Sequence, residues 1–125
     1  MNTIGFFEIQ SSNPKKSIDF YQKIFQWKFT RQETVPIEYY LIETGGIFGG
    51  LLQRPAARPP RDAGTNAFTC SIQVSSFDET AKLILENGGQ VAMPKFAVPK
   101  KCWQGYFVDD DGNLFGLFEV DEHAE

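Results

Sequence analysis

The stretch "SIQVSSFDET", Ser71 to Thr80, repeats the pattern of "EIQSSNPKKS", Glu8 to Ser17, and this repeat decides the fold. The two segments align without a gap at an offset of 63 residues, which places one Ile-Gln pair on the other. In the first segment an Asn-Pro pair is suited to cap and begin a helix, and in the second a Ser and a Glu three residues later form a capping box. Each segment therefore predicts a strand that leads directly into a helix.

The elements around the repeat follow the same order in both halves of the chain. Each predicted helix carries apolar residues at the spacing of one buried face, and three runs of strand character follow it. The sequence therefore predicts an α+β fold of two tandem β-α-β-β-β modules in a single domain, with a Pro/Arg-rich connector between them. The domain spans residues 1–125, the modules span about 3–53 and 67–120, and the connector is residues 54–66.

Composition restricts the class of protein. The chain has 125 residues, of which 42% are apolar and 22% are charged, as in an ordinary globular domain. We expect a cytoplasmic protein with no membrane association, because the N-terminus lacks signal-peptide features and no long apolar run occurs. The net charge of -4 argues against nucleic-acid binding. Cys70 and Cys102 are expected to be reduced thiols.

The stretch "DDDGNLFGLFEV", Asp109 to Val120, admits two interpretations, a calcium loop or a hairpin turn. A helix-loop-helix calcium site ends on a bidentate Glu at the last position of its loop. Counting twelve positions from Asp109 reaches Val120, and counting from Asp110 reaches Asp121. Because Asp-Gly-Asn between two alternating apolar runs is typical of a hairpin, the sequence predicts the turn.

Paired modules with "SIDFY" in the first helix and a "DDDGN" hairpin before the last strand resemble the vicinal oxygen chelate superfamily. That superfamily includes glyoxalase I, bleomycin-resistance proteins, fosfomycin-resistance enzymes and extradiol dioxygenases. The segments "FYQKIFQW", "GGIFGGL", "ENGGQVAMPKFAVP" and "DGNLFGLFE" are similar to the branch described as related to lactoylglutathione lyase. The resemblance implies a curved mixed sheet with a concave cleft and both helices on the convex side.

In catalytic members of that superfamily, four side chains on the inner face bind a divalent metal. By the resemblance, the two first-strand positions fall on Phe6 and Thr69, and the two last-strand positions fall on Gly50 and Gly116. None of these residues is a normal metal ligand, so the resemblance implies a protein with no metal and no other cofactor. Two interpretations of the glycines remain: they open space for an organic ligand, or the sheet needs them in order to bend.

Strand alternation places Phe6, Glu8 and Gln10 on one face, and Ser71 and Gln73 on the matching face of the repeat. Beside aromatic side chains Glu8 could act as a general acid or base, or it could be a strand carboxylate with a salt-bridge partner. The predicted ligand-binding residues are Phe6, Glu8, Gln10, Gly50, Thr69, Ser71, Gln73, Trp103 and Gly116, and Glu8 is the candidate catalytic residue.

Three further features have two interpretations each. His123 is the only histidine, and we expect it to be solvated in a disordered tail rather than catalytic. The arginines of the connector could clamp an anion or could belong to a solvated loop. Trp103 and Phe96 could wall a pocket, or they could belong to the core or to a dimer contact. The arginines are Arg54, Arg58 and Arg61.

The leading functional hypothesis is a protein of this superfamily that binds a small organic molecule in an aromatic cleft without a metal. The alternative is a lyase or isomerase related to lactoylglutathione lyase, which uses either Glu8 as acid or base or a displaced metal site. That displaced set is Glu8, Gln10, Gln73 and Glu119. A purely structural partner in a larger assembly is the third possibility. We expect a homodimer, because small members of the superfamily commonly pair and sheet edges need cover.

Overall fold

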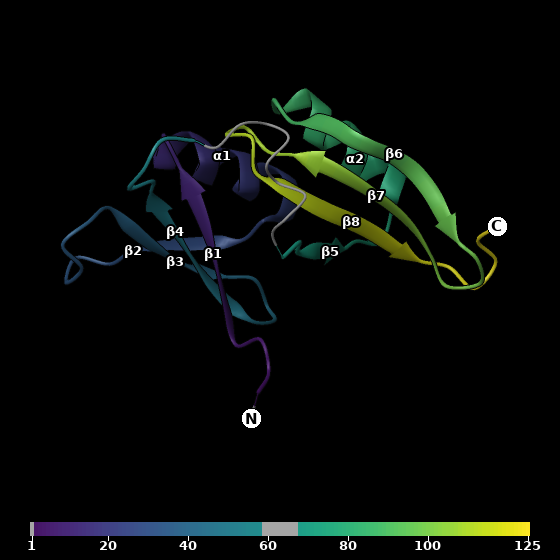
Figure 1. Ribbon diagram of the computed structural model, residues 1–125, viewed down its shortest axis with the longest axis horizontal. Coiled ribbons are helices and arrows are strands. Elements are labelled where there is room, and N and C mark those ends of the chain that lie inside the picture. Colours follow the sequence, from purple (N-terminus) through teal and green to yellow (C-terminus); the bar gives the residue numbers. More distant parts are fainter. Residues whose placement is uncertain (1, 59–67) are drawn as a thin grey trace. The chain divides into compact units, whose positions relative to one another are not determined.

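The computed structural model describes residues 2–58 and 68–125 (Figure 1). The chain divides into two compact units, and the boundary follows Arg58. Residues 59–66 of the predicted connector, with Arg61, lie outside the described residues. The first unit contains β1 (Phe6–Ser11), α1 (Pro14–Phe25), β2 (Lys28–Arg31), β3 (Tyr39–Glu43) and β4 (Phe48–Gln53). The second contains β5 (Ser71–Gln73), α2 (Phe77–Glu86), β6 (Gln90–Val98), β7 (Cys102–Val108) and β8 (Leu114–Val120). The predicted α+β class and the β-α-β-β-β order of both modules are confirmed.

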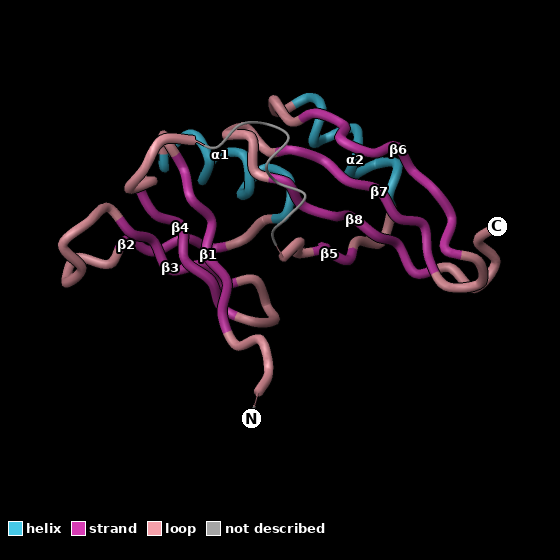
Figure 2. Tube along the Cα trace, viewed as in Figure 1, coloured by secondary structure: helices cyan, strands magenta, loops and turns pink. Residues whose placement is uncertain are grey.

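Each unit has its own mixed four-stranded sheet, with strand order β1-β4-β3-β2 in the first and β5-β8-β7-β6 in the second (Figure 2). The first strand of each module is parallel to the last, and the other neighbours are antiparallel. Where the sequence predicted one sheet, backbone pairing thus gives two, because the strands pair within their own module. The last strand is central in both sheets and lies between the first and the third.

Both helices begin as the sequence predicted. The Asn13 side chain accepts a hydrogen bond from the backbone N–H of Lys16 at 3.3 Å, and the Ser76 hydroxyl accepts one from Glu79 at 3.2 Å. Helix α2 ends at a glycine: Gly88 has a φ of 95°, and the N–H of Gly89 donates to the carbonyl of Ile84. At the end of α1 the left-handed conformation is taken by Gln26 and not by a glycine, with a φ of 56°.

One face of each sheet carries the helix. In the first unit the Ser11 hydroxyl lies 2.6 Å from that of Ser17 on α1, so the odd-numbered residues of β1 face the helix. In the second unit a β-carbon at Gly105 would lie 2.6 Å from the ring of Phe77, the first residue of α2. We call the opposite face of each sheet the helix-free face. Glu8 and Gly50 lie on it in the first unit, as their register pairing requires.

The Asp109–Asn113 segment is a hairpin turn, as predicted. One carboxylate oxygen of Asp109 accepts the backbone N–H groups of Asp111 and Asn113 at 2.8 and 2.9 Å, and Gly112 has a φ of 83°. The antiparallel strands β7 and β8 lead into and out of this turn. The three carboxylates therefore belong to a turn whose first Asp organises the backbone.

Strand β6 runs through Pro94 to Val98, because it is an edge strand with register shifts at which a missing N–H is tolerated. One segment differs from the predictions. The C-terminal tail is ordered: Ala124 is fully buried, and its carbonyl accepts the N–H of Lys100 at 2.9 Å. The side chain of His123 is exposed, as expected. In the described part of the chain, no helix is long and apolar enough to cross a membrane.

Candidate functional site

On the helix-free face of the first unit, two polar side chains from different strands form a hydrogen bond over a glycine of the strand between them. We call this arrangement a glycine crossing. Tyr39 on β3 donates its hydroxyl to Oε2 of Glu8 on β1 at 2.9 Å. Strand β4 lies between them, and its residue opposite Glu8 is Gly50. A β-carbon at Gly50 would overlap the hydroxyl and ring of Tyr39. The ring can therefore reach across β4 only because position 50 has no side chain.

The second unit repeats this arrangement with different chemistry. Gln104 on β7 donates from Nε2 to the hydroxyl of Ser71 on β5 at 3.3 Å. Gly116 on β8 lies opposite Ser71, and a β-carbon there would lie 2.9 Å from Nε2 of Gln104 and would overlap the Ser71 hydroxyl. The register pairs place Gln104 where Tyr39 stands and Ser71 where Glu8 stands. The glycine crossing thus occurs in both units. It includes a carboxylate in the first unit and only neutral side chains in the second.

The Tyr39–Glu8 contact changes the acidity of the phenol. Burial, the hydrogen bond to Glu8 and the charge of Glu8 raise the pKa of Tyr39 from 10.0 to about 12. All three effects favour the neutral phenol. Tyr39 therefore acts as a hydrogen-bond donor at neutral pH and keeps its proton.

The positions that the resemblance assigns to metal ligands do not fit a metal. Phe6 offers no donor atom, Thr69 is an exposed residue that precedes β5, and the two glycine positions are filled by neighbouring side chains. Within residues 2–58 and 68–125, no group of three or more His, Cys, Asp or Glu side chains is arranged to hold a metal ion. The chemistry of the residues present is that of phenol, amide, hydroxyl and carboxylate hydrogen bonding.

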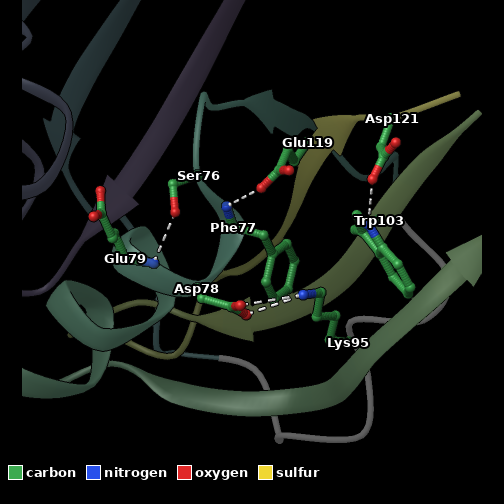
Figure 3. Close-up of polar contacts among 8 residues, drawn as sticks. All are labelled: Ser76, Phe77, Asp78, Glu79, Lys95, Trp103, Glu119 and Asp121. Carbon is green, nitrogen blue, oxygen red and sulfur yellow. Dashed lines mark hydrogen bonds and ion pairs between the residues drawn. The ribbon is translucent and has the colours of Figure 1, made fainter. Parts of the chain in front are cut away.

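The displaced metal set is also not assembled in the second unit. Oε1 of Glu119 accepts the backbone N–H of Phe77 at 2.7 Å, so this carboxylate stabilises the start of α2 (Figure 3). Gln73 pairs in register with Phe118, and alternation therefore places the side chains of Gln73 and Glu119 on opposite faces of the sheet. The two side chains therefore cannot bind the same metal ion.

The structure brings only some of the predicted ligand-binding residues together. Phe6, Glu8, Gln10 and Gly50 share the helix-free face of the first unit, and Ser71, Gln73 and Gly116 share that of the second. Phe6 and its register partner Phe48 are exposed. Trp103 lies on the helix-bearing face, because its neighbour Gly105 at the same parity faces Phe77. Phe96 pairs in register with Gln104, the residue after Trp103, so Phe96 and Trp103 lie on opposite faces of the sheet.

Trp103 instead belongs to a cluster around Lys95 (Figure 3). The ammonium of Lys95 lies 4.7 Å from the centre of the Trp103 ring and 5.6 Å from that of Phe77. It also contacts both carboxylate oxygens of Asp78, at 3.1 and 3.3 Å. The indole N–H of Trp103 donates to Asp121 at 2.9 Å, and this bond and the N–H of His123 hold the pKa of Asp121 below its ordinary value. The cluster joins the edge strand β6 to α2 and to the C-terminal tail.

Sequence reasoning missed Tyr39 and Gln104. Their positions on the third strand of each module are equivalent, but the surrounding segments "EYYLIET" and "CWQGYFV" share too little to reveal it. A signal was present in the two strand glycines, because a glycine on a central strand often marks the close approach of another group. Identifying that group requires the register of three strands.

The sequence model of the Glyoxalase/Bleomycin resistance protein/Dioxygenase superfamily matches residues 3–117. The chain belongs to this superfamily, the vicinal oxygen chelate group. No curated protein sequence matches the chain significantly.

Solved structures share the fold at low sequence identity. The chain is similar to the fosfomycin resistance protein FosX from Listeria monocytogenes, with a TM-score of 0.77, 16% identity and coverage of 97% of this chain and 93% of FosX. A glyoxylase/bleomycin resistance protein/dioxygenase domain from Frankia sp. EAN1pec gives a TM-score of 0.77 and 17% identity, with 98% and 94% covered. A hypothetical protein from S. aureus gives 0.72 and 20%, with 96% and 99% covered. FosX has been crystallised with Mn(II) and sulfate. These likenesses establish the fold alone.

Proposed function

We propose that the chain is a metal-independent member of its superfamily that binds a small organic molecule on the helix-free faces of its sheets. The observation that supports this most is the pair of glycine crossings. A neighbouring side chain occupies the space over Gly50 and Gly116, where the resemblance would place metal-binding carboxylates. Hydrogen-bonding groups of the chain thus take the place of the metal site.

The first unit offers the more complete binding surface. Its helix-free face combines two exposed phenyl rings with a phenol and a carboxylate that are already oriented by each other. Small-molecule sites typically join an apolar surface to a few fixed polar groups. Because the Tyr39–Glu8 hydrogen bond exists before a ligand arrives, little side-chain freedom is lost when one binds.

A lyase or isomerase remains the alternative, and Glu8 is the residue that would carry it. Its carboxylate is exposed and could accept a proton from a bound substrate. Tyr39 donates its one proton to Glu8, and this hydrogen bond would orient the carboxylate toward a substrate proton. The metal-dependent form of this alternative has no support from the described residues.

The test is ligand binding by the full chain after treatment with a chelator. A library of small aromatic compounds is screened by chemical-shift changes in isotopically labelled protein. We expect shifts at the amides of Phe6, Glu8 and Phe48 whether or not manganese, nickel or zinc is restored. The proposal is contradicted if no compound shifts these amides in the chelated protein and the shifts appear only after metal is added.

We further propose that the protein is a homodimer. The edge strands β2 and β6 leave backbone groups that need a partner or cover, and β6 exposes Val91, Met93 and Phe96. Sedimentation equilibrium at micromolar concentration is expected to give twice the chain mass. A monomer at that concentration would count against the proposal.

A further inference from the structure

We infer that the ligand of the first unit is an organic cation, an ammonium group attached to an aromatic or alkyl body, and that Glu8 is its counter-ion. This inference rests on the proposed function, since it requires small-molecule binding on the helix-free face. It adds the charge and the chemical class of the ligand. The residues concerned are Phe6, Glu8, Tyr39 and Phe48, which together form the surface that we call the β1–β4 patch.

The register of β1 and β4 fixes the geometry of this patch. Phe6 is the register partner of Phe48, and Glu8 is the partner of Gly50. Neighbouring strands lie about 4.8 Å apart, and alternate residues of one strand lie about 7 Å apart. The side chains of Phe6 and Phe48 therefore leave the sheet about 7 Å along the strands from that of Glu8. That spacing suits a ligand with an apolar ring at one end and a charged group at the other.

The patch supplies both interactions that an organic cation uses. Phe6 and Phe48 are 44% and 49% exposed, so their rings are available to cover an apolar body. The Tyr39 ring lies beside Glu8 over Gly50, and an ammonium group is attracted to the faces of aromatic rings as well as to a carboxylate. The Tyr39 hydroxyl engages Oε2 of Glu8 and so fixes how the carboxylate is presented.

The charges on this face favour a cation over an anion. Lys28 and Glu43 share the face on strands β2 and β3, but the Lys28 ammonium lies 3.7 Å from the Glu43 carboxylate and is paired with it. Arg54 follows β4, and its Nη2 donates to the Gln10 carbonyl at 3.3 Å, so this cation lies farther along the strands from the phenyl rings than Glu8 does. Glu8 is the only charged residue within β1 and β4 themselves, and its carboxylate is therefore the charge next to the rings. An anionic ligand on the phenyl rings would meet this carboxylate at close range.

The second unit provides an internal comparison. At the positions equivalent to Glu8, Phe6 and Phe48 it has Ser71, Thr69 and Leu114, so it lacks both the carboxylate and the phenyl rings. The backbone arrangement is the same, with Gly116 crossed by Gln104. Cation selectivity should therefore be confined to the first unit.

The test uses three soluble probes with the same ring and different charge: phenethylammonium, 2-phenylethanol and phenylacetate. Each is titrated into the labelled full chain, and the amides of the β1–β4 patch are followed. We expect phenethylammonium to bind about fivefold more tightly than the alcohol at low salt, and this preference to shrink as salt is added. Phenylacetate should bind most weakly.

Two variants test whether Glu8 causes the preference for the cationic probe. Glu8→Gln keeps the size of the side chain and removes its charge, and it should abolish the preference for the cation while the alcohol still binds. Glu43→Gln removes one charge elsewhere on the same face and should leave the preference intact. Equal loss in both variants would overturn the assignment to Glu8, because net charge alone would then explain it.

The outcomes separate this inference from the proposed function. Equal binding of cation and alcohol at the patch leaves the proposed function standing and overturns the inference. Binding of the cation at the Ser71 and Gly116 amides instead of the patch overturns it as well. A chain in which no probe perturbs the patch contradicts both.

Discussion

Replacing Gly50 with alanine is the sharpest perturbation of the glycine crossing. The added β-carbon would occupy the space of the Tyr39 ring, so the ring must leave and its hydrogen bond to Glu8 must break. The lost hydrogen bond costs about 1 kcal/mol, and forcing a group into a packed site costs about 1–3 kcal/mol. Alanine returns about 0.4–1 kcal/mol by restricting the unfolded chain. We therefore expect G50A to lower the free energy of unfolding by about 2 kcal/mol.

Denaturant unfolding measures this cost, and Gly5→Ala is the matched control. A β-carbon added at Gly5 would meet no heavy atom within 4 Å, so G5A should change the free energy of unfolding by no more than about 0.5 kcal/mol. Gly116→Ala should fall between the two, because the groups that it meets include the flexible end of Gln104. Spectrophotometric titration gives a second readout, since the pKa of Tyr39 should fall from about 12 toward 10.0 in G50A. A G50A protein that is as stable as G5A, with an unchanged Tyr39 titration, would show that the Tyr39 ring does not depend on the space over Gly50.

Two further predictions concern single side chains. Folding raises the pKa of Tyr39, so the contribution of this residue to stability is complete below pH 10.0 and is lost as the pH rises to about 12. Tyr39→Phe should therefore flatten this part of the stability–pH curve relative to wild type. An unchanged curve would contradict the prediction. Lys95→Met should lower stability by about 1 kcal/mol and alter the fluorescence of Trp103, because the variant loses the contacts of the ammonium with two aromatic rings. Lys82→Met, on an exposed helix surface, is its control and should be nearly neutral.

The architecture could be read from local signals. The Asn13 and Ser76 caps and the Asp-Gly-Asn turn each depend on a few adjacent residues, and all appear where the sequence placed them. Strand alternation likewise placed Glu8 on the face that the structure gives it. These features follow from backbone geometry that one segment determines by itself.

The site could be predicted only in part, because its contacts join distant strands. Tyr39 and Glu8 are 31 residues apart, and they meet only because β4 lies between their strands with a glycine at the crossing. Lys95 reaches the helix-bearing face beside a register shift in β6, which a regular alternation cannot anticipate. Trp103 was assigned to the ligand-binding set from proximity in sequence to other aromatic residues. Its parity with Gly105 places it on the other face.

The C-terminal tail shows the same limit. Its composition predicted disorder, since "VDEHAE" is polar and terminal. Three contacts hold it: the Trp103 indole donates to Asp121, the backbone N–H of Asp121 donates to Lys101, and that of Lys100 donates to Ala124. All of these partners lie on the turn between β6 and β7 or just after it, so only the folded second unit could reveal them.

The metal content of the purified chain distinguishes a metal-independent protein from a metal-dependent one. The purified full chain is dialysed separately against manganese, nickel and zinc, then against buffer, and its metal is measured by elemental analysis. Gly50 and Gly116 are crossed by Tyr39 and Gln104, so strong donors are not supplied at these positions, and a divalent ion needs such donors to replace its water. We expect far less than one metal ion per chain in every case. One tightly held ion per chain that is lost in neither dialysis nor gel filtration would contradict it.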